Sequence, residues 1–213
     1  MLQINSNIAR MVGATHGTLV HNRRVRMLAN AIAPLIEPQW TVLDVGCGDG
    51  RLANLIRQRI DRVQIQGYDL LVRDGAAIPV RPFDGRHIPQ EDKSVDAVLM
   101  VDVLHHTEDP MVLLREAARV ARTAVILKDH RLERPLAAAT LRFMDWVGNR
   151  PHGVVLPYNY WSQRQWREAW EALGLGVEHY QTRIGLYPLP ARWLFEPGLH
   201  FLARLRPGPV NTT

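Results

Sequence analysis

Short apolar runs alternate with amphipathic stretches along this chain. The run from Trp40 to Val45 precedes a helical pattern in which apolar residues recur at spacings of one, three and four. Similar apolar runs at Val63–Asp69, Val95–Val101 and Thr123–Leu127 predict further strands, with helical patterns between most of them. Strands that alternate with helices favour a parallel sheet, in which ligands bind at the carboxyl ends of the strands. We therefore expect an α/β fold.

The remaining pattern predicts three more strands and a leading helix. Apolar positions between Asn22 and Ile36 fit one face of a helix. A short third strand is expected over Ala77–Phe83, although two prolines interrupt it. Val177–Ile184 and Leu199–Leu205 are the candidate C-terminal strands, joined by a proline-rich connection.

End signals predict where several helices begin. Asp109 before Pro110 predicts a helix start, because aspartate caps free N–H groups and proline suits the first helical position. Ser162 and Gln165 have the spacing of a capping box, in which each residue satisfies a backbone group of the other. A further helix is expected over Pro135–Val147.

Length and composition suit one domain that buries a substantial core. The chain has 213 residues, of which 46% are hydrophobic. It contains no apolar run near the roughly 20 residues that span a bilayer, so we expect no stable membrane insertion. Met1 to Arg10 lacks a secretory pattern, which favours a cytoplasmic protein. The single cysteine, Cys47, excludes an internal disulfide and a cysteine-built metal site.

The charge of the chain is basic but dispersed. The formal net charge is +5 and the pI is near 9.9. All but two of the 26 basic residues are arginine, and they are scattered from Arg10 to Arg206 with one tight cluster at residues 23–26. Nucleic-acid-binding domains gather such charges on one face or stripe. We therefore expect no nucleic-acid partner.

The stretch Val42–Gly50 combines a strand, a glycine turn and the start of a helix. Glycine tolerates positive φ and lets the backbone approach a ligand closely. The following helix points its free N–H groups at the same place. Asp69 follows Gly50 by 19 residues, the position from which an acid at the tip of the second strand binds ribose hydroxyls. NAD shares these features, but the spacing here is G-x-G-x-G rather than G-x-G-x-x-G.

Four motifs in order carry a family resemblance. The run VLDVGCGDG, Asp69, Phe83-Asp84-Gly85 and IPQEDKSVDAVLMVDVLHHTEDP resemble the class I S-adenosylmethionine-dependent methyltransferases, and most closely their small-molecule type 11 group. The resemblance covers Val25 to Leu127, about half the chain. It implies a Rossmann-like fold: a mostly parallel seven-stranded sheet with helices on both faces and an antiparallel C-terminal strand.

The resemblance also implies a set of cofactor contacts. Asp44, at the end of the first strand, would hold the amino group of S-adenosylmethionine. The glycine loop would lie under its methionine and ribose parts, and Asp69 would bind the ribose hydroxyls. Leu70 would pack on the adenine, with Asp84 at its amino group. The expected S-adenosylmethionine site consists of Asp44, Gly46, Cys47, Gly48, Asp69, Leu70, Asp84, Gly85 and Val101.

The methyl acceptor should lie beyond the fourth and fifth strands. His130, His106 and Asp102 are the candidate catalytic residues there. The candidate substrate contacts are His105, Asp145, Asn149, His152, Tyr158 and Asn159. A tryptophan-rich segment in this half favours a small aromatic or apolar acceptor. No metal site is expected, since no two histidines have helical ligand spacing.

These expectations divide the single domain into functional segments. In chain order they are an N-terminal helical segment or lid, a cofactor-binding core, a substrate-side insert, C-terminal strands and a tail, at residues 1–38, 40–128, 129–174, 175–206 and 207–213. The pattern leaves the oligomeric state open.

Three other interpretations remain open. The chain could methylate RNA or protein, although an Asn-Pro-Pro-Tyr-type motif is absent after the fourth strand. It could also bind S-adenosylmethionine without catalysis and regulate a partner. A lipid-like or quinone-like acceptor at a membrane surface is suggested by Trp193-Leu194-Phe195, a stretch that could equally lie in the core.

Overall fold

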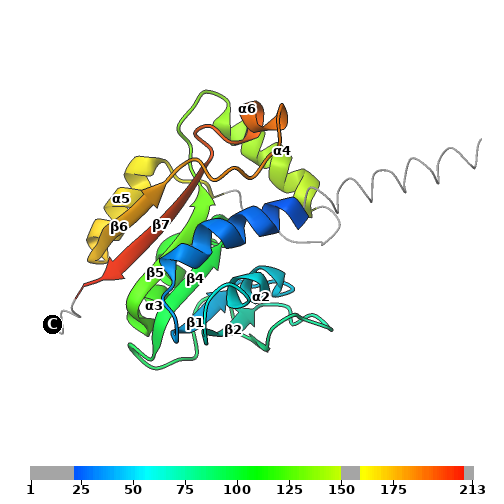
Figure 1. Cartoon of the computed structure of the whole chain (residues 1–213). Coiled ribbons are helices and arrows are strands. Elements are labelled where there is room, and N and C mark those ends of the chain that lie inside the picture. Colours follow the sequence, from blue (N-terminus) through cyan, green and yellow to red (C-terminus); the bar gives the residue numbers. More distant parts are fainter. Residues whose placement is uncertain (1–21, 150–158, 209–213) are drawn as a thin grey trace, which may run out of the picture.

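A single mixed sheet organises the part of the chain that the structure describes, residues 22–149 and 159–208 of a computed structural model (Figure 1). Its seven strands are β1 Thr41–Val45, β2 Gln64–Asp69, β3 Val80–Pro82, β4 Val95–Val101, β5 Ala121–His130, β6 Leu175–Gln181 and β7 His200–Pro207. They lie in the order β3-β2-β1-β4-β5-β7-β6. The first five strands pair in parallel, and β7 runs antiparallel to both of its neighbours. This arrangement confirms the predicted fold.

Most helices lie where the pattern predicted them, but the short helix Ala191–Phe195 was not predicted and lies within the proline-rich connection. A helix through residues 22–32 leads into η1, and the later helices are α2 to α6 with the short η2; the bounds are η1 Ala33–Leu35, α2 Arg51–Arg57, η2 Leu104–His106, α3 Pro110–Val120, α4 Ala137–Asn149, α5 Gln163–Ala172 and α6 Ala191–Phe195. Asp109 caps α3 by accepting the Met111 N–H, with Pro110 at the first position. Ser162 and Gln165 form the predicted capping box of α5.

Alternating residues of the central strands fill two cores, one on each face of the sheet. Val98 and Met100 of β4 point to the core shared with α3 and α5, whereas Ala97 and Leu99 point to the core shared with α2. The helix of residues 22–32 lies across this second face beside α2 (Figure 1). Burial on both faces explains why these strands read as continuous apolar runs rather than alternating ones.

Several strand bounds differ from the prediction. The third strand is only Val80–Pro82, because prolines limit the backbone donors available for pairing. The fifth strand is longer than Thr123–Leu127 and continues through polar residues to His130. Pairing with β7 supports this extension, since His130 lies opposite His200. The first C-terminal strand begins at Leu175, earlier than predicted.

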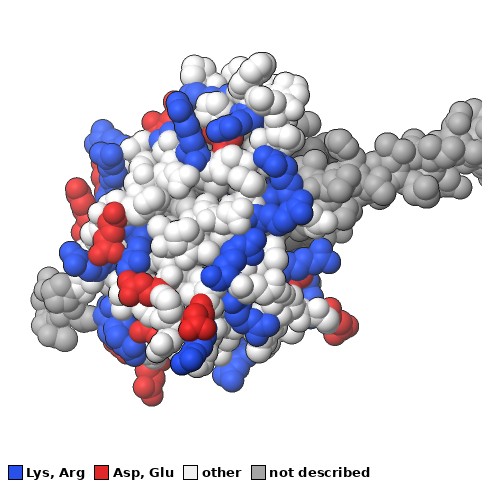
Figure 2. Space-filling model, viewed as in Figure 1, with Lys and Arg blue, Asp and Glu red and all other residues white. Residues whose placement is uncertain are grey.

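The surface carries an exposed apolar turn and mixed charges. Trp193 and Leu194 of α6 are 71% and 63% exposed, so these two side chains are not in the core. In the described part of the chain, the helices are too short or too polar to cross a bilayer. Figure 2 shows basic and acidic side chains interspersed on the face in view, in keeping with the scattered arginines of the sequence.

Candidate functional site

The glycine loop after β1 forms an open backbone cradle. Gly46, Gly48 and Gly50 all have positive φ, between 59° and 73°. A Cβ at Gly46 would lie 2.5 Å from Val103 Cγ2, whereas a Cβ at Gly48 would meet nothing within 4 Å. The loop is therefore closely packed beneath and open at Gly48, where a ligand can approach the main chain.

Asp69 at the end of β2 is fixed against this loop. One carboxylate oxygen accepts the Gly48 N–H at 2.7 Å and the other accepts the Leu71 N–H at 3.0 Å. A carboxylate offers about four acceptor positions, so both oxygens can still accept from a diol. The position fits the predicted ribose contact.

An exposed apolar side chain, Leu70, lies next to Asp69. Leu70 is 70% exposed and covers Gly85, where a Cβ would be 3.0 Å from Leu70 Cδ2. Beside it, Asp84 accepts the His87 and Arg86 N–H groups, and these bonds lower the pKa of its carboxyl. An exposed leucine next to an anionic carboxylate suits a flat heteroaromatic ring that carries an amino group.

Asp44 is buried beneath the loop at the end of β1. Burial and the nearby charge of Asp69 raise the pKa of its carboxyl to about 7. A cationic group close by would favour the ionised form of Asp44.

The thiol of Cys47, in the same loop, stays protonated. Burial and the charges of Asp44 and Asp69 raise its pKa to about 12. The open backbone at Gly48, the three carboxylates of Asp44, Asp69 and Asp84, and the exposed Leu70 side chain together fit S-adenosylmethionine.

A second polar cluster lies at the carboxyl ends of β4 and β5. It contains the predicted Asp102, His105 and His130, and four residues that were not predicted: Arg24, Lys128, Asp129 and His200. Lys128, Asp129 and His200 are fully buried. Buried charges persist in proteins only where partners compensate them, so the pairing within this cluster defines its chemistry.

Asp102 is held by two cations. It directly follows β4 with φ of +58°, and its carboxylate contacts Lys128 Nζ and, at 2.6 Å, Arg24 Nη2. Burial raises the pKa of Asp102, but the charges of Lys128 and Arg24 outweigh this effect and hold it well below its ordinary value. Asp102 is therefore an anion that binds cations and a weak proton acceptor.

Asp129 is paired with a histidine instead. Its Oδ1 lies 2.6 Å from His105 Nδ1 and accepts the His130 N–H at 2.7 Å, while Oδ2 accepts the Leu104 N–H at 3.0 Å. Burial raises the pKa of Asp129, but its interactions with His105 and His130 outweigh burial and lower the pKa below its ordinary value.

His130 and His200 complete the cluster as neutral rings. Burial, His105 and Lys128 lower the pKa of His130 to about 4. Burial, reinforced by Lys128, likewise holds the pKa of His200 well below its ordinary value. His130 Nδ1 lies 3.4 Å from His105 Nδ1, and His200 Nδ1 lies 3.4 Å from Lys128 Nζ.

Four of these side chains also bring potential metal ligands together: Asp102, His105, Asp129 and His130 offer atoms within 4.8 Å of one another. The helical spacing rule used on the sequence does not test this group, because two of its members follow β4 and the other two lie in β5. Charge balance favours a hydrogen-bonded network. Lys128 and Arg24 already neutralise Asp102 and would repel a divalent ion there.

The comparisons with known proteins agree with this geometry. The family model described as "Methyltransferase domain" matches residues 19–180. The chain belongs to this methyltransferase family. The match spans the glycine loop and all of the polar cluster except His200, and the family implies S-adenosylmethionine as the methyl donor.

Solved structures of low sequence identity share the fold of this methyltransferase. A possible histamine N-methyltransferase from Thermotoga maritima aligns with a TM-score of 0.64 and 20% identity, covering 93% of this chain and 97% of its own. An S-adenosylmethionine-dependent methyltransferase from Aquifex aeolicus gives a TM-score of 0.56, 18% identity and coverage of 81% and 84%. A third match is a chain from a Haloferax volcanii complex of the Trm112 methyltransferase activator with a protein assigned as a methyltransferase. It aligns with a TM-score of 0.66 and 18% identity, covering 92% of this chain and 95% of its own.

The other predicted residues of the methyltransferase are only partly placed. The His106 ring lies 4.0 Å from that of His105, and the Asn159 N–H donates to the His105 carbonyl at 3.2 Å. Val101 ends β4, half-buried beside Asp102. Asp145 and Asn149 belong to α4, at positions whose side chains are not described; His152 and Tyr158 lie outside the described residues.

Sequence reasoning missed the charged end of β5. Lys128 and Asp129 directly follow the apolar run that ends at Leu127, and two adjacent charges there could have signalled a functional strand end. The signal for Arg24 and His200 is weaker, since each comes from a distant element. His200 is found only through its register opposite His130.

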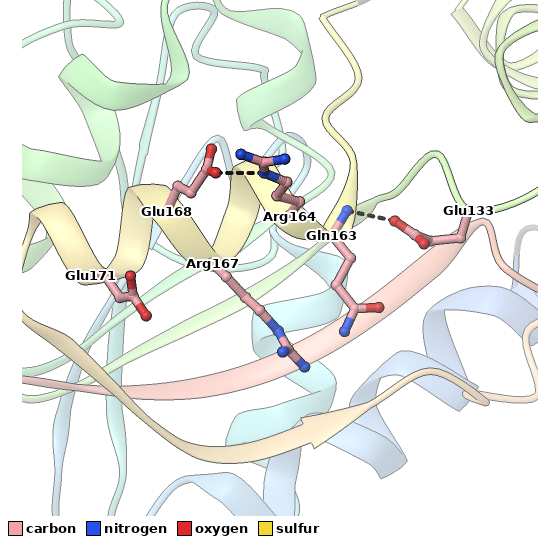
Figure 3. Close-up of a pocket in the computed structure, with 6 residues that line it drawn as sticks. All are labelled: Glu133, Gln163, Arg164, Arg167, Glu168 and Glu171. Atoms are coloured by element: carbon pink, nitrogen blue, oxygen red, sulfur yellow. Dashed lines mark hydrogen bonds and ion pairs between the residues drawn. The ribbon is translucent and has the colours of Figure 1, made fainter.

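A depression of about 400 Å³ beside α5 is not part of this site. Figure 3 shows Arg164 paired with Glu168, and the backbone N–H of Gln163 donating to Glu133. Arg164 is almost fully exposed, and exposed pairs of this kind contribute little energy. None of the predicted site residues lines the depression.

Proposed function

We propose that this protein is an S-adenosylmethionine-dependent methyltransferase that acts on a small-molecule acceptor. The observation that carries the proposal is the pairing of Asp69 with the N–H of the open Gly48, inside the part of the chain that the family model matches. When bound, S-adenosylmethionine supplies a methyl group activated by its sulfonium.

The residues of this chain would bind and orient both reactants. Asp69 would accept the ribose hydroxyls, Asp84 and Leu70 would hold the adenine, and Asp44 would pair with the amino group. Methyl transfer requires the acceptor atom, the methyl carbon and sulfur in line. Such positioning supplies up to about 7–11 kcal/mol of barrier reduction.

The polar cluster at the ends of β4 and β5 supports a small acceptor. Its charged groups are mutually paired, and Lys128 and Asp129 are fully buried, which suits a polar pocket. The arginines are scattered along the chain rather than gathered in one segment, which argues against an RNA acceptor. We further propose that residues 129–174 form the acceptor side of one domain.

Calorimetric titration with S-adenosylmethionine tests the proposal. We expect micromolar binding by the unaltered protein and a loss of roughly 10-fold or more in Asp69→Ala, as a hydrogen bond to a charged group contributes about 1.5–3 kcal/mol. Asp74→Ala is the matched control, because Asp74 is an exposed acid in the same loop. The proposal fails if the protein does not bind, or if both variants bind like the original.

A second measurement identifies the acceptor. Mass spectrometry of a metabolite-acceptor screen should show S-adenosylhomocysteine and one product heavier by a methyl group. Binding without turnover of any acceptor would instead indicate a regulatory module.

A further inference from the structure

Four large apolar side chains are exposed at one end of the molecule. Leu189, Trp193 and Leu194 belong to α6 and the turn before it, and Leu136 to the turn before α4; their exposed fractions are 64%, 71%, 63% and 79%. The Arg134 guanidinium joins the two turns by donating to the Leu194 carbonyl at 2.5 Å, and Figure 1 shows α6 beside α4. These four residues are called the apolar patch below.

The backbone that carries the apolar patch is held in place from the interior. Glu196, at the end of α6, is 2% exposed, accepts the Gly185 N–H and pairs with Arg192 at 3.0 Å. The exposure of Trp193 and Leu194 is therefore a property of the fold and not of a frayed end. Apolar side chains that a folded protein exposes next to one another often mark an interaction surface.

The surroundings of the apolar patch are basic. Residues 131–142 and 183–198, which carry the patch, contain five arginines and two glutamates, a net charge of +3 compared with +5 for the whole chain. One of the two glutamates, Glu196, is buried, whereas Arg183 and Arg192 are exposed. Figure 2 shows basic side chains beside uncharged surface at this end of the molecule. The surface thus combines apolar contact area with a local excess of positive charge.

The apolar patch lies at the end of the sheet that carries the polar cluster. β5 ends at His130, shortly before Leu136, and β7 begins at His200, shortly after α6. The His200 ring contacts the Phe195 carbonyl of α6 through Nε2 at 2.9 Å. Anything that binds the patch therefore lies close to the polar cluster.

A lipid surface matches both features of this region. Tryptophan concentrates at the boundary between headgroups and hydrocarbon, because its ring is apolar and its N–H still reaches water. Leucines beside it enter the acyl boundary, and arginines attract anionic headgroups. A stable protein–protein interface takes about 20–30 residues from each partner, far more than the four residues of the patch. The lipid surface is therefore the better match.

We propose that the apolar patch docks this protein on the surface of an anionic membrane, with the neighbouring arginines against the lipid phosphates. The docking is peripheral, and no helix among the described residues is long and apolar enough to cross the bilayer. It goes beyond the proposed function and does not depend on it. Docking holds the polar cluster next to the lipid, so that an acceptor dissolved in the membrane reaches the site without crossing water.

Flotation with lipid vesicles tests the docking. The full chain should float with vesicles made of equal parts of phosphatidylcholine and phosphatidylglycerol, and much less with vesicles of phosphatidylcholine alone. Added salt should weaken the binding, because it screens charges at the surface. No flotation with the anionic vesicles, or equal flotation with both kinds, would overturn the proposal.

The apolar contribution is tested by the double variant Trp193→Ser/Leu194→Ser. It should bind anionic vesicles about 10-fold more weakly or worse, because burial of a single large apolar side chain already contributes about that factor. Val177→Ser is the matched control: Val177 is 51% exposed near the start of β6, at the opposite end of the sheet. Equal binding by the two variants would refute the assignment of the surface.

The basic contribution is tested by Arg183→Gln. It should weaken binding to the anionic vesicles roughly five-fold, the effect of one arginine close to such a surface. Arg62→Gln is the control, because Arg62 is an exposed arginine before β2, also at the opposite end of the sheet. An equal loss in both variants would show that the net charge of the chain drives binding, and would overturn the docking site.

Hydrogen–deuterium exchange locates the contact without any variant. Anionic vesicles should slow exchange in residues 185–198 and leave residues 175–181 unchanged. Protection confined to other segments would overturn the proposal, and this measurement decides if the double variant does not fold. Dimers in sedimentation velocity that the double variant abolishes, without lipid binding by the original protein, would assign the patch to a second copy instead. Failure of S-adenosylmethionine binding would refute only the proposed function.

Discussion

The two buried carboxyl groups of this site, those of Asp129 and Asp44, have opposite electrostatic environments. Asp129 lies among three hydrogen-bond donors and keeps its charge. Asp44 lies near the negative Asp69, and burial adds to the repulsion, so its pKa rises to about 7. A residue whose charge is disfavoured in the cofactor-free protein is suited to meet a cation. We interpret Asp44 as a carboxyl that is partly protonated without the cofactor and becomes fully ionised when it pairs with the amino group of the methyl donor.

This interpretation predicts an effect on stability that grows as the pH rises. The ordinary pKa of 3.8 rises to about 7 on folding, so the folded state holds the proton more tightly and stability falls as pH rises between these values. We expect Asp44→Asn to raise the Tm of the cofactor-free protein at pH 8 and to raise it much less at pH 5. The same variant should bind S-adenosylmethionine more weakly. Thermal unfolding and calorimetry check both parts.

Asp96→Asn is the control of opposite sign. Hydrogen bonds from Thr41 and the charge of Arg122 outweigh partial burial and lower the pKa of Asp96, so its stabilisation is present above pH 3.8 and lost in acid. This substitution should lower the Tm at pH 8. A fall for Asp44→Asn at pH 8 would contradict the interpretation.

At the scale of elements, the glycine loop is supported by close packing on β2. A Cβ added to Gly67 would lie 2.4 Å from Cys47 Sγ, within the glycine loop that follows β1. Gly67 does not have positive φ, so the need for glycine here comes from space alone. The packing of Cys47 thus links the second strand to the shape of the binding loop.

Gly67→Ala should therefore destabilise the protein by about 1–3 kcal/mol through overpacking and weaken cofactor binding. Gly176→Ala in β6 is the matched control, because its Cβ would meet only the Arg206 carbonyl at an ordinary 3.9 Å. Alanine there should be neutral or stabilise slightly. Urea unfolding of both variants measures the difference; equal midpoints would refute the packing argument.

At the scale of the whole molecule, Arg204 joins the last strand to the segment before the first. From β7 it donates to the Leu35 carbonyl at 2.9 Å and to Glu178 at 3.0 Å, and its guanidinium lies 5.1 Å from the Trp40 ring centroid. The side chain is only 18% exposed, so these contacts are partly shielded from water. The bond to Leu35 connects residues that are 169 positions apart.

We expect Arg204→Ala to lower the free energy of unfolding by about 1–3 kcal/mol, because a partly buried carbonyl and carboxylates lose their donor. Arg206→Ala is the control: its side chain is 71% exposed and pairs with Glu178 at 3.4 Å, so its loss should stay within about 0.5 kcal/mol. The midpoints of urea unfolding curves report both values. Similar losses would show that Arg204 acts as a surface charge only.

The features that the sequence determined by itself depend on neighbours a few residues apart. The glycine turn of residues 46–50, the Asp109 cap and the capping box at Ser162 are local, and each is present as predicted. The apolar runs also predicted the strands of the sheet, because a strand buried on both faces needs continuous hydrophobic residues. Backbone sterics and capping bonds act within one turn, so their pattern can be read directly.

Only the tertiary structure decided the acceptor side of the site. The pairs Asp129–His105, Lys128–Asp102 and Arg24–Asp102 span 24, 26 and 78 residues. The buried charges of Lys128 and Asp129 are tolerated because partners from other elements compensate them, and the burial that shifts their pKa values exists only after the sheet has formed. The sequence thus predicted the glycine loop and the acid that follows it. Folding determined which side chains form the polar cluster at the ends of β4 and β5.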